Sequence, residues 1–410
     1  MDIMEYLSAA LCMASFPVAL CAQDDSVSVQ MAEAPVLRTE SIEEVLSAIA
    51  GNNPSLSAYM EDVQAQTFQM KGENVPEDPS VEYSSFYKGG ISGESGSELI
   101  VSQGFDFPTL YAARHKRNEL MQASLDKGLE NERRKVLLQA KNLCLDIIMY
   151  RQIGEILDMQ SSIASELLSL YSKRYETGDA SALEVNKIRM ELMGVATAVA
   201  ENSSALDASC RALTAMNGGR EIDFTADWYP LVEEITDPEA AVEEYLSADA
   251  AVSSAENAAA AAVKDVSVNR QGWIPKLEIG YRRNTEIREA EHGFIVGGSI
   301  PLYSNHRKVA MSKARSAAAH STLSSVRLQA ETEIRTAIND AVRMKAAIEA
   351  YDEPLMRETL ELLNKAVEGG EISLIDYFVE ASGIYSNLTS CIGLRNSWQK
   401  LMAKIYSNRL

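Results

Sequence analysis

Most of the chain carries apolar residues at the three- and four-residue spacing of amphipathic helices. Two of these patterns are far longer than an ordinary helix: one covers about 112–175 without a proline, and the other about 306–367. At about 1.5 Å per residue, a helix over the first stretch is on the order of 95 Å long. Such lengths are typical of bundles and coiled coils rather than of globular domains.

Four shorter segments alternate apolar and polar residues with a period of two. In one of them Leu99, Val101 and Phe105 fall on one face, while the other face is mostly small or polar. This pattern predicts β-strands with one apolar face, at about 79–88, 98–108, 274–283 and 293–302. Each half of the chain then contains a single β-hairpin, which is too little to be stable alone.

The order helix, two strands, long helix, returning helix occurs twice. P-S-V-E-Y at 79–83 corresponds to P-K-L-E-I at 275–279, and other segments correspond at a nearly constant offset. We therefore predict a mainly α chain with a membrane β part, built from a duplicated αββα repeat. The repeats are expected at 41–219 and 237–410, with a linker at 220–236 between them.

One short pattern interrupts both long helical stretches. Y-E-T-G-D-A-S-A-L-E-V at 175–185 and V-E-G-G-E-I-S-L-I-D-Y at 367–377 each place a glycine and a serine before a returning helix. Each reads as the tip of a helical hairpin, at about 176–183 and 368–375. Glu184 and Asp376 lie just inside the returning helices. Acids at these positions are placed favourably at the N-terminal end of a helix dipole.

Composition and charge exclude several functions. The net charge of −21 argues against a nucleic-acid partner. Nucleotide-binding and hydrolase motifs are missing, and the four histidines lack metal-ligand spacing. Cys144, Cys210 and Cys391 are far apart and give neither a disulfide framework nor a metal site. We expect no enzymatic activity, no cofactor and no metal.

The N-terminus looks like an export signal. Residues 1–22 have the apolar core of a signal peptide, although Asp2 and Glu5 stand where basic residues are usual. Cys21 is a candidate lipoprotein cysteine, but Leu20 before it is larger than that processing usually accepts. Residues 23–40 are expected to be a flexible segment. Since no apolar run beyond residue 22 is long enough for a transmembrane helix, a membrane role would have to come from the strands.

The order and spacing of these segments resemble TolC-type outer-membrane efflux proteins. The residues that carry the resemblance are the two tips, N-N-P-S-L (52–56), F-P-T-L-Y (107–111), I-P-L-Y-S (300–304) and E-P-L-M-R-E-T-L (353–360). The resemblance implies a homotrimer in the outer membrane of a Gram-negative bacterium, with helices forming a periplasmic α-barrel. Each chain would give four strands to a 12-stranded β-barrel in contact with outer-membrane lipid. Such a channel is the passive exit duct of a tripartite efflux or secretion system, docked to a periplasmic adaptor and an inner-membrane pump.

The resemblance also assigns roles at the tips. Asp376 matches the family's tip aspartate and Glu184 is its counterpart, so a trimer would carry rings of negative charge that favour cations. The residues expected to present the tip surface to the adaptor are Gly178, Ser181, Leu183, Gly370, Ser373 and Leu374. Family members often have a basic residue four positions before the tip acid, where this chain has Ile372 and Ala180. A salt-bridge lock of that kind is not expected, and Lys173 and Arg174 are the nearby alternatives.

Two other functions fit parts of the pattern. An exported coiled-coil scaffold without a pore would explain the long helices and the signal peptide, but not the four amphipathic strands. A periplasmic adaptor also has helical hairpins, but adaptors usually carry one hairpin with flanking β-domains rather than a duplicated order.

Overall fold

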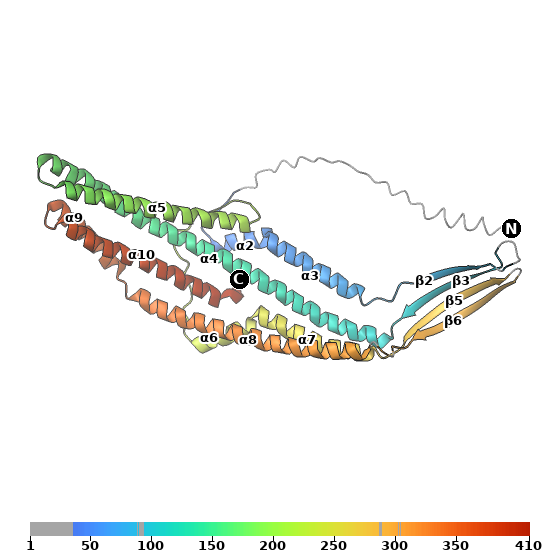
Figure 1. Cartoon of the computed structure of the whole chain (residues 1–410). Coiled ribbons are helices and arrows are strands. Elements are labelled where there is room, and N and C mark those ends of the chain that lie inside the picture. Colours follow the sequence, from blue (N-terminus) through green and yellow to red (C-terminus); the bar gives the residue numbers. More distant parts are fainter. Residues whose placement is uncertain (1–35, 88, 90–93, 287–288, 302, 304) are drawn as a thin grey trace. The chain divides into compact units, whose positions relative to one another are not determined.

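The computed structural model describes residues 36–410 except 88, 90–93, 287–288, 302 and 304 (Figure 1). The predicted signal peptide at 1–22, with Cys21, lies outside the described residues. The elements in chain order are β1 (Leu37–Thr39), α2 (Ile42–Asn52), α3 (Pro54–Gly72), β2 (Ser80–Phe86), β3 (Gly96–Phe105), α4 (Pro108–Thr177), α5 (Ala182–Met216), β4 (Ile222–Phe224), α6 (Pro238–Ala248), α7 (Ala250–Gln271), β5 (Lys276–Glu286), β6 (Glu289–Ser299), α8 (Asn305–Glu349), α9 (Glu353–Gly369), α10 (Leu374–Ile405) and the short 3-10 helix Ser407–Arg409.

The first helices begin at capping residues that the sequence makes recognisable. The hydroxyl of Ser41 accepts a hydrogen bond from the amide of Glu44 at 3.4 Å, which starts α2. Asn53 caps α3 by accepting from the amide of Leu56 at 3.0 Å, with Pro54 in the first turn. The side-chain amide of Asn53 also donates to the carbonyl of Met216 at 2.9 Å, so this break is fastened to the end of α5.

A small parallel strand pair corrects two expectations. Leu37–Thr39 pairs with Ile222–Phe224, so the end of the segment predicted as flexible (23–40) is structured, and the predicted linker at 220–236 contains a strand. Ile222 and Phe224 are 5% and 3% exposed. Strands of three residues are too short to show a period of two, so alternation of apolar and polar residues could not predict them.

The other strands form one antiparallel sheet in the order β2-β3-β5-β6. The register aligns Val81, Val101, Tyr281 and Phe294 in one row across the sheet. Residues directly opposite one another share a face, and that face exposes the large apolar side chains of Val81, Tyr83, Val101, Ile279, Tyr281, Phe294 and Val296. The other face is mostly small or polar, as in the row Ser80, Ser102 and Gly280. The two-faced sheet that the alternation predicts is therefore present.

The second hairpin is longer than predicted. The strand expected at 293–302 begins instead at Glu289 and ends at Ser299, and its partner β5 extends to Glu286, which pairs with Glu289. The two strands thus include residues 284–286 and 289–292, which the predicted strand bounds left out. Residues 284–292 are largely polar on both faces, so no apolar alternation marked them as strand.

The long helices fold into two hairpins. α4 has 70 residues, about 105 Å at the usual helical rise, and α5 returns along it (Figure 1). The stretch predicted as one helix from 306 to 367 is two, α8 and α9, with a break at 350–352. Asp352 caps α9 by accepting from the amide of Leu355 at 3.0 Å, and Pro354 lies in its first turn, where a missing N–H costs nothing.

The core is divided into three apolar clusters along the helices. One surrounds Ile49, Cys144 and Leu213, where α2, α4 and α5 meet. A second joins α6, α8 and α10 around Tyr245 and Ile338. The third joins the two hairpins near their tips. Among the described helices, none is both long enough and apolar enough to cross a membrane.

Candidate functional site

The first tip is a tight turn set by a glycine and a run of bonds to one carbonyl. α4 ends at Gly178, whose φ of 85° lies in the left-handed region that glycine favours. The amides of Asp179 and Ala180 both donate to the carbonyl of Arg174, at 2.7 and 3.1 Å. The hydroxyl of Thr177 donates to the carboxylate of Asp179 at 2.8 Å. The first two bonds satisfy the carbonyl of Arg174 in the last turn of α4, and all three hold the turn.

The returning helix starts with a complete capping box. The hydroxyl of Ser181 accepts from the amide of Glu184 at 3.2 Å, and the Glu184 carboxylate accepts from the amide of Ser181 at 2.7 Å. The backbone hydrogen bond from Ser181 lowers the pKa of Glu184, helped by the Ser181 hydroxyl and the positive charge of Arg174. Glu184 is therefore a carboxylate at neutral pH.

The second tip repeats this geometry. Gly370 ends α9 with a φ of 76°, and the amide of Glu371 donates to the carbonyl of Ala366 at 2.9 Å. Ser373 caps α10: its hydroxyl accepts from the amide of Asp376 at 3.1 Å and donates to the Asp376 carboxylate at 2.6 Å. Both tips thus share a left-handed glycine and a serine cap, whereas the described residues show the reciprocal bond from the serine amide to the acid at the first tip and not at the second.

The two predicted pore acids occupy equivalent positions in the two tips. Each carboxylate accepts a hydrogen bond from its own cap serine, at 2.7 Å for Glu184 and 2.6 Å for Asp376. Asp376 is exposed and Glu184 is half-buried. Further acids in or beside the two turns are Glu176, Asp179, Glu368 and Glu371.

Most of the residues predicted to present a docking surface are exposed. Gly178, Ser181, Gly370 and Ser373 are exposed, and the side chain of Leu183 is 72% exposed. The prediction is wrong for Leu374, which is 1% exposed in the cluster that joins the hairpins. The first residue of α10 points into that cluster, and the next residue, Ile375, is the exposed counterpart of Leu183 at 48%.

The two hairpins pack against each other just behind the tips. Tyr171, Val185 and Ile188 of the first hairpin share one buried cluster with Val367 and Tyr377 of the second. The guanidinium of Arg174 donates to the carbonyl of Glu368 at 2.9 Å, and it lies over the ring of Tyr171 at 5.2 Å from the centroid. Arg174 is thus the cation that links the tips, through a backbone carbonyl rather than a carboxylate.

The positions where the family often has a basic residue serve packing here. Ile372 and Ala180 are partly buried against the shared cluster. Beside them the hydroxyl of Tyr377 donates to the side chain of Asn364 at 2.7 Å. Arg174 is one of the two cations predicted near the tips, but its partner Glu368 and the bond of Tyr377 could not be predicted, because each bond joins two elements that only the fold brings together. Among the described residues, no group of three His, Cys, Asp or Glu is placed to hold a metal ion.

Comparisons with known proteins give the fold. No family model and no curated protein matches the chain. Solved structures do match: a membrane protein from Pseudomonas aeruginosa has a TM-score of 0.75 at 14% identity, covering 90% of this chain and 93% of that one. The CmeC outer membrane channel of Campylobacter jejuni gives 0.75 at 14% identity, with 93% and 90% covered. The outer membrane protein VceC of Vibrio cholerae gives 0.74 at 15% identity, with 90% and 95% covered. The resemblance to TolC-type outer-membrane efflux proteins is therefore confirmed at the level of the fold.

Proposed function

We propose that this chain is the passive exit duct of a tripartite efflux or secretion system. It would sit in the outer membrane of a Gram-negative bacterium as a homotrimer and extend into the periplasm. A periplasmic adaptor and an inner-membrane pump would dock at the helical tips and supply the energy. The observation that carries the proposal is the four-stranded sheet, which has an exposed apolar face and two open edges at one end of long helical hairpins.

The open edges favour assembly with copies of the same chain. Unpaired edge strands expose backbone N–H and C=O groups that seek a partner. Since neighbouring strands alternate in direction, β6 runs opposite to β2, and β6 of one copy can pair antiparallel with β2 of the next. Three copies of four strands would make a closed 12-stranded barrel. The apolar face would then meet lipid and the polar face would line water.

The scaffold alternative is less well supported. A scaffold without a pore needs coiled coils but has no use for a sheet with Phe294 and Val296 at 89% and 81% exposure. Contiguous exposed apolar surface of this kind marks a protein or membrane contact. An outer-membrane barrel gives that surface a partner, and a water-soluble rod does not.

The tip acids supply the first functional test. We predict that Glu184→Gln with Asp376→Gln lowers the cation preference of the channel without preventing trimer assembly, because rings of carboxylates attract cations at a constriction. The measurement is the reversal potential of single channels in planar bilayers under a salt gradient, after the trimer has been verified by light scattering. Asp179→Asn with Glu371→Gln is the matched control, since it removes the same charge from neighbouring turn positions.

The outcomes separate the two interpretations of these acids. A loss of selectivity in the first pair and not in the control supports pore lining. Unchanged ion selectivity in the first pair would contradict it, and leave Glu184 and Asp376 as helix-capping residues only. An equal loss of cation selectivity in both pairs would indicate that the acidic residues of the tips act together through their summed charge, rather than as one ring of carboxylates.

A further inference from the structure

Cationic side chains gather where the sheet meets the long helices, although the chain as a whole has a net charge of −21. α8 begins with Asn305, His306, Arg307 and Lys308 and has no acidic residue in its first turn. Cations are unfavourable at the N-terminal end of a helix dipole. Arg307 and Lys308 therefore do not stabilise the start of α8, and their placement favours an anion from outside the helix.

A cavity of about 400 Å³ lies beside this helix start. Its walls come from the beginning of α4, the end of α7, the ends of β5 and β6 nearest the helices, and the first turn of α8. Three cations line it, namely Arg114, Lys276 and Lys308, against the single carboxylate of Asp106. The apolar part of the wall is formed by Leu110, Val268, Ile274 and Ile300. The cavity thus combines a positive side with an apolar side.

The three cations are not equally available. Arg114 donates to the carboxylate of Asp106 at 2.8 Å, and both side chains are largely buried. Lys276 is ion-paired with Glu77. Lys308 is exposed and makes no ion pair with any other described residue. Lys308 is therefore the lining cation whose charge is left for a ligand.

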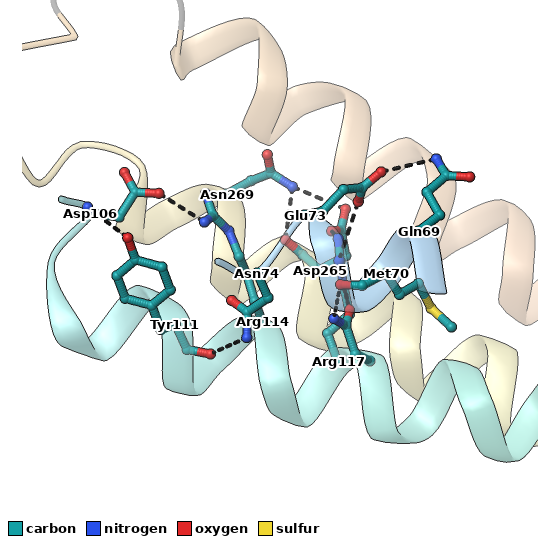
Figure 2. A network of polar contacts seen from close by, with 11 residues as sticks. Gln69, Met70, Glu73, Asn74, Asp106, Tyr111, Arg114, Arg117, Asp265 and Asn269 are labelled. Carbon is teal, nitrogen blue, oxygen red and sulfur yellow. Dashed lines mark hydrogen bonds and ion pairs between the residues drawn. The ribbon is translucent and has the colours of Figure 1, made fainter. Parts of the chain in front are cut away.

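The wall is held in place by a polar network (Figure 2). The backbone amide of Asp106 donates to the hydroxyl of Tyr111 at 3.1 Å, so the carboxylate that pairs with Arg114 is fixed to α4. The side chain of Asn305, 3% exposed, donates to the carbonyl of Asn269 at 3.0 Å, which joins α8 to α7. A Cβ at Gly272 would lie 2.6 Å from the Oδ1 atom of Asn305, so a side chain there would displace the buried Asn305 amide. The cavity is therefore preformed.

A ligand that matches both sides of the cavity is a phosphate attached to an apolar chain. If the sheet spans the outer membrane, as the proposed function requires, the cavity lies at the helix-side rim of the sheet, at the level of the periplasmic headgroups. Basic side chains at that level attract anionic lipid headgroups. We infer that the cavity binds the phosphate headgroup of a glycerophospholipid of the periplasmic leaflet, through Lys308 and the Arg114–Asp106 pair. The inference rests on the proposed function for the source of the lipid.

The test is lipid binding to the purified full chain in detergent, followed by native mass spectrometry during titration with phosphatidylglycerol. The wild-type chain is expected to retain phosphatidylglycerol, and Lys308→Gln to weaken the apparent affinity about tenfold, as the loss of one charge-assisted hydrogen bond does. The matched control is Lys313→Gln, an exposed lysine farther along α8 that does not line the cavity. Thermal unfolding of both variants verifies that they are folded. Diacylglycerol and inorganic phosphate serve as comparison ligands.

Weaker binding of phosphatidylglycerol by Lys308→Gln but not by Lys313→Gln, with no binding of diacylglycerol, supports the inference. Equal binding by the wild type and both variants would overturn it, and so would binding of inorganic phosphate without binding of phosphatidylglycerol. Lipid binding is measured independently of whether the protein conducts ions. A chain that conducts but binds no phosphatidylglycerol would therefore overturn this inference alone, whereas a chain that never conducts would count against the proposed function.

Discussion

At the scale of single residues, the pH response of the first tip depends on Glu184. Its carboxylate accepts from the amide of Ser181, so the folded pKa lies below the unfolded value. A depressed pKa stabilises the fold above the unfolded pKa, and this contribution disappears as the pH falls through the folded pKa. Because the site faces solvent, the effect should be small, of the order of helix-terminus charge effects at about 0.3–1 kcal/mol.

We therefore predict that acidification loosens the first turn of α5 in the wild type. Hydrogen exchange protection of the amides near Glu184 should fall between about pH 5 and pH 3, the range in which glutamates titrate. Glu184→Gln can keep the capping bond, since glutamine also completes a capping box, but it has no charge to lose. The variant should show flat protection over the same range. If protection in the wild type does not change on acidification, the charge of Glu184 does not stabilise the first turn of α5.

At the scale of elements, the turn glycines set the hairpin tips. Gly370 has a φ of 76° with no atom within 4 Å of an added Cβ, so only the backbone conformation opposes a side chain there. Gly370→Ala should lower the free energy of unfolding by about 1 kcal/mol, the usual cost of a left-handed L-residue. Gly51→Ala in α2 is the control, because its φ is not positive and its Cβ position is also free. The control should be neutral or slightly stabilising in thermal unfolding. Equal destabilisation by both would show that the turn conformation is not the cause.

If the proposed channel opens at its tips, the contact between the two hairpins must break. Arg174 donates to the carbonyl of Glu368, and its neighbour Lys173 is exposed with no ion pair among the described residues. We predict that Arg174→Gln increases the frequency of channel openings in planar bilayers, while Lys173→Gln leaves it unchanged. Removing one hydrogen bond from a charged donor should shift the closed-to-open balance about tenfold. Equal gating in both variants would mean that the apolar cluster alone holds the tips closed.

The sequence predicted the elements better than their contacts. Long helices, two-faced strands and glycine–serine tips depend on local periodicity and capping, which can be read directly from residues such as Gly178 and Ser373. The β1–β4 pair was missed because three residues carry no periodicity, and Leu374 was misplaced because burial depends on the partner hairpin. The Arg174 bond joins residues 194 positions apart, a pairing that only the packed fold defines.

At the scale of the whole molecule, the sheet decides between a membrane channel and a soluble scaffold. Phe294 is the sixth of the 11 residues of β6, midway along the strand, and is 89% exposed on the apolar face. Its neighbour Ile295 lies on the opposite face, aligned with Gly280. If the sheet spans a bilayer, the side chain at position 294 meets lipid and the side chain at position 295 meets water. The same substitution at adjacent positions therefore compares the two faces at one depth.

We predict that Phe294→Lys reduces recovery of the protein in the outer-membrane fraction, because a lysine facing lipid near the bilayer midplane costs about 2–4 kcal/mol. Ile295→Lys should insert and assemble as the wild type does, since its ammonium would reach the water-filled lumen. The measurement is the fraction of trimer that floats with outer membranes in a density gradient. In a soluble scaffold both substitutions would replace an apolar side chain in water by a lysine, and neither would change the fractionation. Equal recovery of both variants would therefore indicate that the sheet does not lie in the bilayer, and would favour the scaffold.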